Sequence, residues 1–436
     1  MGRNIVIKGF AAAIFALTLL VSTAVSVPAQ EEGISFSDVS AESQFPWGIT
    51  FHVGATASEP IVKAELLYSQ AELETLYLEA PDIEPSTQID AELELDLYNN
   101  YLPPGIQLTY RWRLTTESGA TIDSEPQAFE WTDLRFEWKQ IATDQVSVWY
   151  YASGEGFAQS ILDTAQETID RLRSEYGLAQ PSQIRLWVYE SGGDFNGAQI
   201  PNSQEWVVGA AYPDLGLILA VLPDGEDWEV DRVVPHEITH QVLRQASENP
   251  FNVPPLWFDE GFAVFQQVTG NDHFPEMVAE AAADGRLLLL RYLTAEYPFD
   301  PSDVTLSYAQ SFSVVSFIVE QWGKESIGEL VNEFAKGVTH DEAFTAALGV
   351  NVDELEKMWR ESLGSPSAVG SVGADGTSTE DFIINASAIL LAGAAIASGA
   401  IAIRRYRKQM SLGEETEIDL FQMSNITNHA GGGHGD

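Results

Sequence analysis

Two histidines and a glutamate stand together in the segment Pro235–Leu243, which reads PHEITHQVL. His236 and His240 are four residues apart, so on a helix their imidazoles lie on one face, one turn apart, within reach of a single metal ion. Glu237 lies beside that face, where its carboxylate can take a proton from water. The alternative is a surface helix that carries these residues by chance. The chain has only seven histidines, so a chance match to the HExxH pattern would be rare. We therefore favour the metal site.

A catalytic zinc needs a third protein ligand and one open position. Glu260, in PPLWFDEGFAVF, follows His240 after nineteen intervening residues. We expect Glu260 to begin a helix, with Pro254-Pro255 fixing the approach and Gly261 permitting close packing against the metal helix. Asp259 is expected either to support a ligand histidine from behind or to serve as an ordinary carboxylate at a helix N-terminus.

The chemistry that this set permits is hydrolysis of an amide bond. Zinc bound by His236, His240 and Glu260 would lower the pKa of a water in its fourth position and polarise a substrate carbonyl. Glu237 would accept the proton of that water and return it to the leaving amine, so no covalent intermediate forms.

The developing oxyanion requires one hydrogen-bond donor besides the metal. The candidates are Tyr308, His273 and His340. Tyr308, in LSYAQSFSVV, is preferred because a helix that starts downstream of the third ligand can return to the cleft. The alternative, that Tyr308 only packs in the core, stays open.

Composition limits the classes of function. The chain of 436 residues has 45% hydrophobic residues and 11 tryptophans, so it can form two or three domains with substantial cores. Its net charge is −43, from 65 acidic and 22 basic residues, which excludes binding to the phosphates of nucleic acids. We attribute the acidity to solubility. With no cysteine, the chain has no disulfides, Cys-ligated zinc or cysteine nucleophile.

The two ends of the chain predict an outward-facing membrane protein. Residues 1–29 have a basic start, an apolar run and small residues at the end, as in a secretion signal that is either cleaved or kept as an anchor. Residues 382–403 carry no charge and are long enough to span a bilayer. The basic residues that follow place the tail, 404–436, in the cytoplasm and the preceding domains outside the cell membrane. Residues 364–381 are expected to be a flexible linker.

Residues 31–137 predict an all-β module. Apolar-alternating runs near residues 48, 61, 91 and 108 are separated by turn-forming clusters near 58, 81, 102 and 117. This rhythm favours an immunoglobulin- or fibronectin-like sandwich. The module shows no catalytic cluster, and His52 is expected to pack within a strand. We interpret the module as a spacer or as a binding domain for a cell-surface partner.

Residues 138–363 predict an α+β domain that carries the metal site. Strands are expected near 146, 184, 206 and 215, followed by the His236 helix, in which Pro235 is tolerable only in or near the first turn. From residue 258 onward the pattern indicates helices alone, at 258–269, 273–283, 306–322, 325–336, 340–348 and 352–363.

The motifs HEITH and LWFDEGFAVF, with the later YAQSFSVVSFIVEQWG and AFTAALGVNVDELEKMW, resemble the gluzincin metallopeptidases, particularly the peptidase MA-like group. The resemblance covers roughly residues 140–363. It implies a gluzincin-like fold, a Zn²⁺ cofactor, a peptide or protein substrate, ligand roles for His236, His240 and Glu260, and Glu237 as the base.

The chain differs from two groups of gluzincins at positions that bear on the type of peptidase. M1 aminopeptidases resemble this chain at HExxH and at the third-ligand helix, but their GAMEN stretch supplies a glutamate for the substrate's free amine. This chain has Gly209-Ala210-Ala211-Tyr212 in the comparable place, which favours an endopeptidase. The spacing to Glu260 is similar to that of thermolysin-like enzymes, yet their aspartate four residues after the ligand is Val264 here.

The sequence therefore predicts a multidomain, membrane-anchored zinc metallopeptidase that faces outward. The second hypothesis is a cell-surface binding or scaffold protein whose zinc site is structural or vestigial. The open fourth position argues against a purely structural metal.

Overall fold

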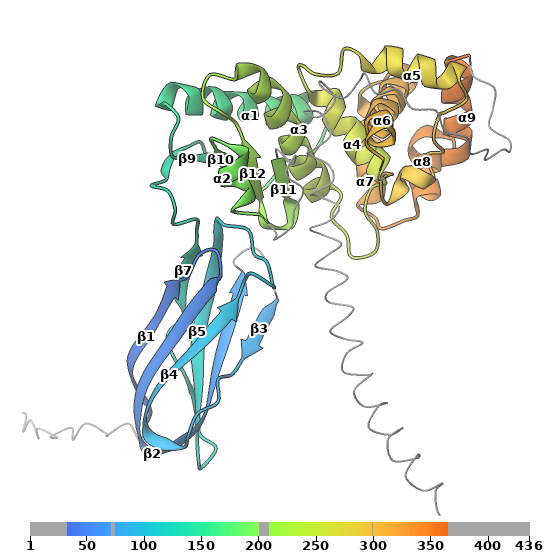
Figure 1. The fold of residues 1–436 in the computed structure, drawn as a ribbon. Coiled ribbons are helices and arrows are strands. Elements are labelled where there is room, and N and C mark those ends of the chain that lie inside the picture. The colour runs from blue at the N-terminus through green and yellow to red at the C-terminus, as the bar shows by residue number, and fades with distance from the viewer. Residues whose placement is uncertain (1–32, 71–74, 200–208, 299, 365–436) are drawn as a thin grey trace, which may run out of the picture.

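The computed structural model describes residues 33–70, 75–199, 209–298 and 300–364 (Figure 1). The predicted secretion signal, membrane span and cytoplasmic tail lie outside these ranges, and so does the linker apart from Gly364. Within the described ranges, no helix is both long and apolar enough to cross a membrane. The predicted topology therefore stays a prediction.

The N-terminal module consists of strands, as the alternating sequence predicts. In β5 every second residue is buried, from Ile106 to Leu114, and the residues between them are polar or half-exposed. Such alternation gives one apolar face that must be covered. The strands are β1 (Ser35–Ser43), β2 (Gly48–Gln70), β3 (Leu76–Glu79), β4 (Ser86–Asp96), β5 (Ile106–Thr116), β6 (Thr121–Asp123) and β7 (Gln127–Trp131).

The long strand β2 connects the two halves of this module. Its first half pairs with β1 and β4, and its second half pairs with β3 and β5. The predicted turn near residue 58 is wrong, because the chain stays extended there. The register with β4 shifts between Thr56 and Ile61, and this irregularity bends the strand without ending it. Immunoglobulin- or fibronectin-like topology stays an expectation.

The second domain begins with a five-stranded sheet in the order β11-β12-β10-β9-β8. Strands β9, β10 and β12 are parallel, whereas β8 and β11 run antiparallel to their neighbours. Helix α1 (Glu155–Tyr176) connects β9 to β10 and ends at Gly177 in the left-handed conformation. The strands are β8 (Lys139–Ala142), β9 (Val146–Tyr150), β10 (Ile184–Tyr189), β11 (Gly209–Tyr212) and β12 (Leu217–Val221).

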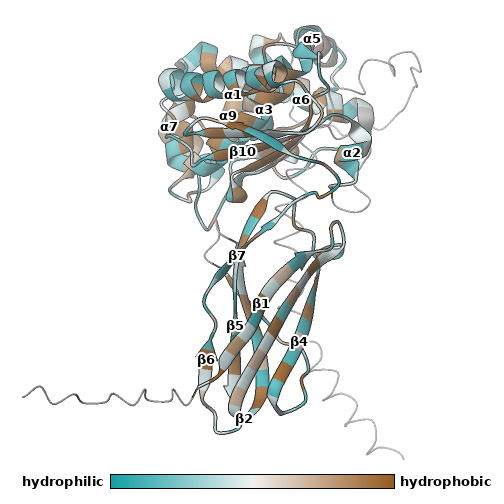
Figure 2. Cartoon of the chain, turned by 90° about the vertical axis from the view of Figure 1, so that its left-hand side faces the viewer, coloured by the Kyte–Doolittle hydropathy of each residue, from teal (hydrophilic) through white to brown (hydrophobic). Residues whose placement is uncertain are grey.

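Both faces of this second sheet are covered. Leu186 and Val188 of β10 belong to the core shared with the helices, whereas Trp187 and Tyr189 belong to the core shared with the N-terminal β module, residues 35–131, which is called the sandwich below after its predicted fold. Figure 2 shows the sheet, labelled at β10, between α1 and α3 above and the sandwich below. A Cβ on Gly105, a sandwich residue with φ +95°, would overlap the Trp187 ring. The sandwich is therefore packed against the second domain.

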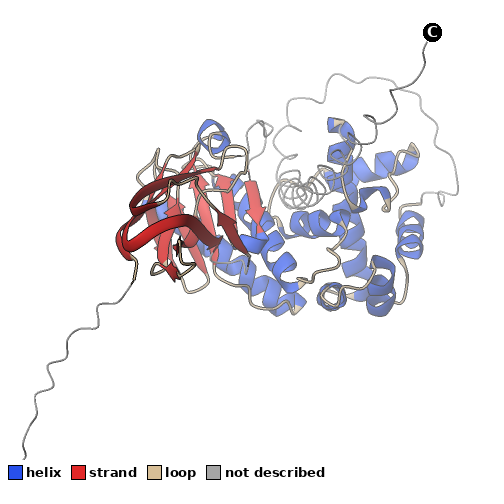
Figure 3. Ribbon diagram, turned by 90° about the horizontal axis from the view of Figure 1, so that it is seen from below, coloured by secondary structure: helices blue, strands red, loops and turns tan. Residues whose placement is uncertain are grey.

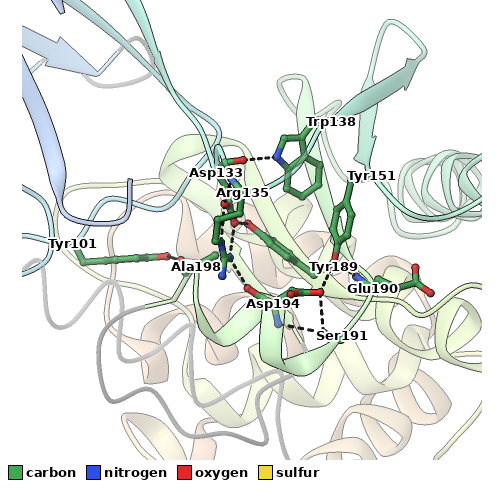
Figure 4. Close-up of polar contacts among 10 residues, drawn as sticks. All are labelled: Tyr101, Asp133, Arg135, Trp138, Tyr151, Tyr189, Glu190, Ser191, Asp194 and Ala198. Carbon is green, nitrogen blue, oxygen red and sulfur yellow. Dashed lines mark hydrogen bonds and ion pairs between the residues drawn. The ribbon is translucent and has the colours of Figure 1, made fainter. Parts of the chain in front are cut away.

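Polar contacts hold the junction of the two domains (Figure 4). Asp133, fully buried, accepts from Arg135 and from the Tyr189 hydroxyl. Arg135 also donates to the carbonyl of Asp194 at 2.7 Å, and Tyr101 donates to the carbonyl of Ala198 at 2.8 Å. The segment before β5 and the segment after β7 are thus both fixed to the second domain.

The rest of the domain is helical, and Figure 3 shows most of the helices to one side of the strands. Thr339 with Glu342 and Asn351 with Glu354 form capping boxes that begin α8 and α9. The helices are α2 (Gly192–Asn196), α3 (Asp227–Ala246), α4 (Leu256–Gln266), α5 (Phe274–Ala283), α6 (Pro301–Trp322), α7 (Glu325–Phe334), α8 (His340–Leu348) and α9 (Val352–Ser362), with short 3₁₀ turns at Pro213–Leu215 and Tyr292–Thr294.

Two expectations about helix starts are wrong. Pro235 lies in the interior of α3, not in or near its first turn, and Glu260 lies in the second turn of α4. Proline cannot donate to the carbonyl of Asp231, four residues earlier. The N–H of Val268, which follows α4, donates to that carbonyl instead, at 3.0 Å. The helix continues because another segment replaces the missing donor.

Candidate metal centre

Helices α3 and α4 bring the three predicted ligands together. His236 and His240 lie one turn apart on α3, and Glu260 faces them from α4. The two Nε2 atoms are 3.1 Å apart, and each lies 3.6 Å from Oε2 of Glu260. Within the part of the chain that the structure describes, this is the one group of three or more ligand-type side chains close enough to share a metal ion.

The geometry and the donor set fit zinc. Bonds of about 2.0–2.1 Å in a tetrahedron place ligand atoms roughly 3.3 Å apart, close to the three separations observed here. Both oxygens of Glu260 are buried and accept no hydrogen bond from the described residues. A buried carboxylate without a partner is costly unless a cation neutralises it. His236, His240 and Glu260 would therefore hold zinc.

The protonation of the site also favours a cation. Burial lowers the pKa of His236 to about 4, so this imidazole is neutral near pH 7, as a ligand must be. Burial also opposes the charge of His240, but Asp259 and Glu260 outweigh it and raise the pKa of His240 to about 10. A positive charge is thus stabilised between the ligands, and a metal ion supplies it in place of the proton.

Asp259 supports His240 from behind. Nδ1 of His240 donates to Oδ1 of Asp259 at 2.7 Å, and Nε of Arg244 donates to Oδ2 at 2.7 Å. Burial would raise the pKa of Asp259, but Arg244 and His240 lower it to about 2. Of the two roles expected for Asp259, the structure shows contact with a ligand histidine.

Glu237 lies next to the sheet edge. Neither of its oxygens accepts a hydrogen bond from a described residue, although the side chain is buried. Burial raises the pKa of Glu237 to about 8, close to the range where a general base works best. A Cβ on Gly209, the first residue of β11, would overlap the Glu237 carboxyl. The sheet edge approaches the carboxyl this closely because Gly209 has no side chain.

The three candidate oxyanion donors lie in different places. Tyr308 is buried on α6, which packs against α4, and its ring meets Tyr297 edge-on at 5.0 Å. His273 precedes α5 and contacts Phe274. Nε2 of His340 contacts the carbonyl of Val253 at 2.8 Å. The catalytic role of Tyr308 stays a prediction.

Sequence reasoning missed three side chains around the site. Gln267 contacts Nδ1 of His236 at 2.8 Å, and Arg244 holds Asp259. Tyr297 bonds to Ser311 at 2.8 Å, beside the helix contact formed by Gly261. Arg244 could have been found, because it lies four residues after His240 on the same helix face. No pattern in the sequence indicates Gln267 or Tyr297.

A helix-borne His-His-Glu set, with a buried glutamate beside it that has no hydrogen-bond partner among the described residues, defines a metal centre of the zinc metallopeptidase type. Residues 164–365 match the model of the Peptidase MA superfamily. The match confirms the resemblance to gluzincin, peptidase MA-like enzymes. With the ligand set, it supports the expected Zn²⁺ cofactor and the expected zinc-dependent hydrolase.

Individual relatives are more distant. The uncharacterized protein YhcO of Bacillus subtilis is 26% identical over 145 residues, 30% of this chain and 40% of that protein. The chain thus matches less than half the length of this curated relative. An M1 zinc metallopeptidase from Deinococcus radiodurans superposes with a TM-score of 0.35 and 13% identity, covering 75% of this chain and 93% of that one. A TM-score this low supports no inference about the fold or function of the present chain.

Proposed function

We propose that this protein is a membrane-anchored zinc endopeptidase that acts outside the cytoplasm. The observation that carries the proposal is the triangle of His236, His240 and Glu260 at zinc-ligand separations, beside the Glu237 carboxyl, which has no hydrogen-bond partner among the described residues. When bound, zinc supplies a Lewis acid that activates water and polarises the carbonyl to be attacked.

The protein's own residues perform the proton transfers. Glu237 takes a proton from the attacking water and delivers it to the amine that leaves. Its carboxyl accepts no competing hydrogen bond from the described residues, so both oxygens are available. Asp259, held by Arg244, keeps the Nδ1 proton of His240 in place and so directs Nε2 of that ring toward the metal. Tyr308 is the proposed donor to the oxyanion.

Strand β11 favours endopeptidase action. It is the last described strand of the sheet and lies beside Glu237, so an extended peptide can pair with its outer edge. Its residues Gly209–Tyr212 include no carboxylate to bind a free N-terminal amine. A substrate can therefore extend in both directions from the bond that is cut.

Anchoring and orientation rest on sequence alone. The uncharged run 382–403 and the basic residues after it support a single span with the tail in the cytoplasm. Protease protection of sealed vesicles tests this topology: a tag at residue 436 should be protected, whereas the domain with the zinc site should be accessible from the outer side.

The decisive experiment compares wild-type chain and Glu237→Gln on internally quenched peptides with free and with acetylated N-termini. Wild-type protein should bind one zinc and cleave both sets, and chelation should stop cleavage. Glu237→Gln should keep zinc and lose cleavage, by about 10³-fold or more. Retained cleavage in that variant would overturn the mechanism, and cleavage of free N-termini only would indicate an aminopeptidase.

The second candidate is a cell-surface binding or scaffold protein with a structural or vestigial zinc site. The extensive strand surface of the module at 35–131 is the observation in its favour. Zinc-loaded wild-type chain that cleaves no member of a broad peptide library would favour this alternative.

A further inference from the structure

The two ligand histidines are supported by different groups. Nδ1 of His240 meets the carboxylate of Asp259, whereas Nδ1 of His236 meets the side-chain amide of Gln267 at 2.8 Å. Gln267 follows the last residue of α4, seven positions after Glu260. We propose that Gln267 is a positioning residue that directs Nε2 of His236 toward the metal, and that the proline in α3 provides the place where it docks.

The docking begins at Pro235. Because proline lacks an N–H, the carbonyl of Asp231 has no donor within its own helix. The N–H of Val268 donates to that carbonyl at 3.0 Å, and the Thr269 hydroxyl donates to the carbonyl of Trp228 at 3.1 Å. The segment after α4 is therefore fixed along the first turns of α3. Gln267, the neighbour of Val268, is brought against His236 by the same contacts.

The chemistry requires a particular orientation of the Gln267 amide. Zinc needs the lone pair of Nε2 of His236, so the ring proton sits on Nδ1 and the group that faces it must accept. The structure places Nε2 of Gln267 at 2.8 Å from Nδ1, and rotation of the amide by half a turn brings its oxygen, the acceptor, to the same place. The oxygen and nitrogen of an amide have nearly the same shape, so the proton on Nδ1 decides which of them faces the ring. The support given to His236 is therefore neutral, unlike the carboxylate behind His240.

The test measures zinc affinity of the full chain by competition with a chromogenic chelator. Gln267→Met keeps the length of the side chain and removes the acceptor, so zinc affinity should fall tenfold to a hundredfold. Gln267→Glu restores an acceptor and should bind zinc at least as tightly as wild type. Gln245→Met, at a glutamine of α3 that contacts Ser182 rather than a ligand, should leave zinc affinity unchanged.

A second variant tests the docking and guards against a general folding defect. Pro235→Ala gives Asp231 a donor within α3, in competition with Val268, so zinc affinity should fall while the metal-free chain melts no lower than wild type. Visible spectra of Co²⁺-substituted Gln267→Met should also change. Unchanged zinc affinity in Gln267→Met would overturn the proposed role, and unchanged affinity in Pro235→Ala would overturn the docking.

The inference rests on the zinc site of the proposed function but not on peptide cleavage. Wild-type chain that binds no zinc would overturn both together. Tight zinc binding by wild type and by Gln267→Met alike would overturn this inference alone, and zinc binding without any cleavage would overturn the peptidase activity alone.

Discussion

The Tyr189 hydroxyl donates to Oδ2 of Asp133 at 3.2 Å, joining the end of β10 to the segment that leaves the β-sandwich. Around this bond, Trp187 and Tyr189 share one core with sandwich residues. The sandwich therefore covers the back of the sheet whose front supports the metal helix. This packing adds a structural role to the spacer or binding role expected from its sequence, which stays a prediction.

Removing the sandwich should unfold or aggregate the rest of the chain. A truncation that lacks residues 31–137 leaves Trp187, Tyr189 and Leu217 of the sheet without their apolar cover, which costs several kcal/mol. Size-exclusion chromatography and thermal melting measure this. A monomeric truncated chain with the melting temperature of the whole would show that the shared core contributes nothing.

A point variant tests the same junction without truncation. Asp133→Ala should destabilise the fold by about 3 kcal/mol, because the partly buried cation of Arg135 loses its partner. Asp123→Ala, which breaks a more exposed ion pair with Arg113 within the sandwich, is the matched control and should cost less than about 1 kcal/mol. Denaturant titration gives both values, and equal losses would contradict a special role for the junction.

Replacing Arg244 should weaken the site through Asp259. In Arg244→Met the buried carboxylate loses its counter-ion, so metal-free protein should lose about 2–3 kcal/mol of stability. The pKa of Asp259 should rise from about 2 toward its usual value. Arg173→Met, at an exposed arginine of α1, is the control. An unchanged melting temperature in Arg244→Met would show that Arg244 does not stabilise the charge of Asp259.

Adding one methyl group at the sheet edge should impair catalysis. Gly209→Ala places a Cβ against the Glu237 carboxyl, so kcat/KM should fall at least about tenfold while zinc stays bound. Gly156→Ala, in α1 with open space around it, should change neither quantity. Steady-state kinetics with metal analysis distinguish these outcomes, and full activity in Gly209→Ala would place the reacting water elsewhere.

The metal-free protein should show the titration of Glu237 in its stability. Burial raises the pKa of Glu237 from 4.5 to about 8, so the folded chain holds this proton more tightly than the unfolded chain. The stabilisation is complete below pH 4.5 and is lost as pH rises to about 8, by about 1.4 kcal/mol per pH unit at most. Melting curves of wild type and Glu237→Gln should therefore diverge across this interval, with wild type losing more. Parallel curves would contradict the raised pKa.

The parts of the site that local sequence patterns define were predictable. The pairing of His236 and His240 follows from helix periodicity, and Glu260 was found from its motif and its spacing after His240; the structure brings these ligands together. The interior position of Pro235 was not predictable, because the donor that compensates for it, Val268, lies more than thirty residues away in the sequence. The turn expected near residue 58 failed for a similar reason, since strands β4 and β5 keep β2 extended.

Gly261 stands directly after the third ligand, and a Cβ there would overlap the backbone carbonyl of Ser311 on α6. The backbones of α4 and α6 are therefore in direct contact at this point, with no side chain of residue 261 between them. Because Glu260 adjoins this contact and Tyr308 lies one turn before Ser311, a displacement of either helix would move the metal ligand and the proposed oxyanion donor together. The same contact between α4 and α6 therefore positions both Glu260 and Tyr308.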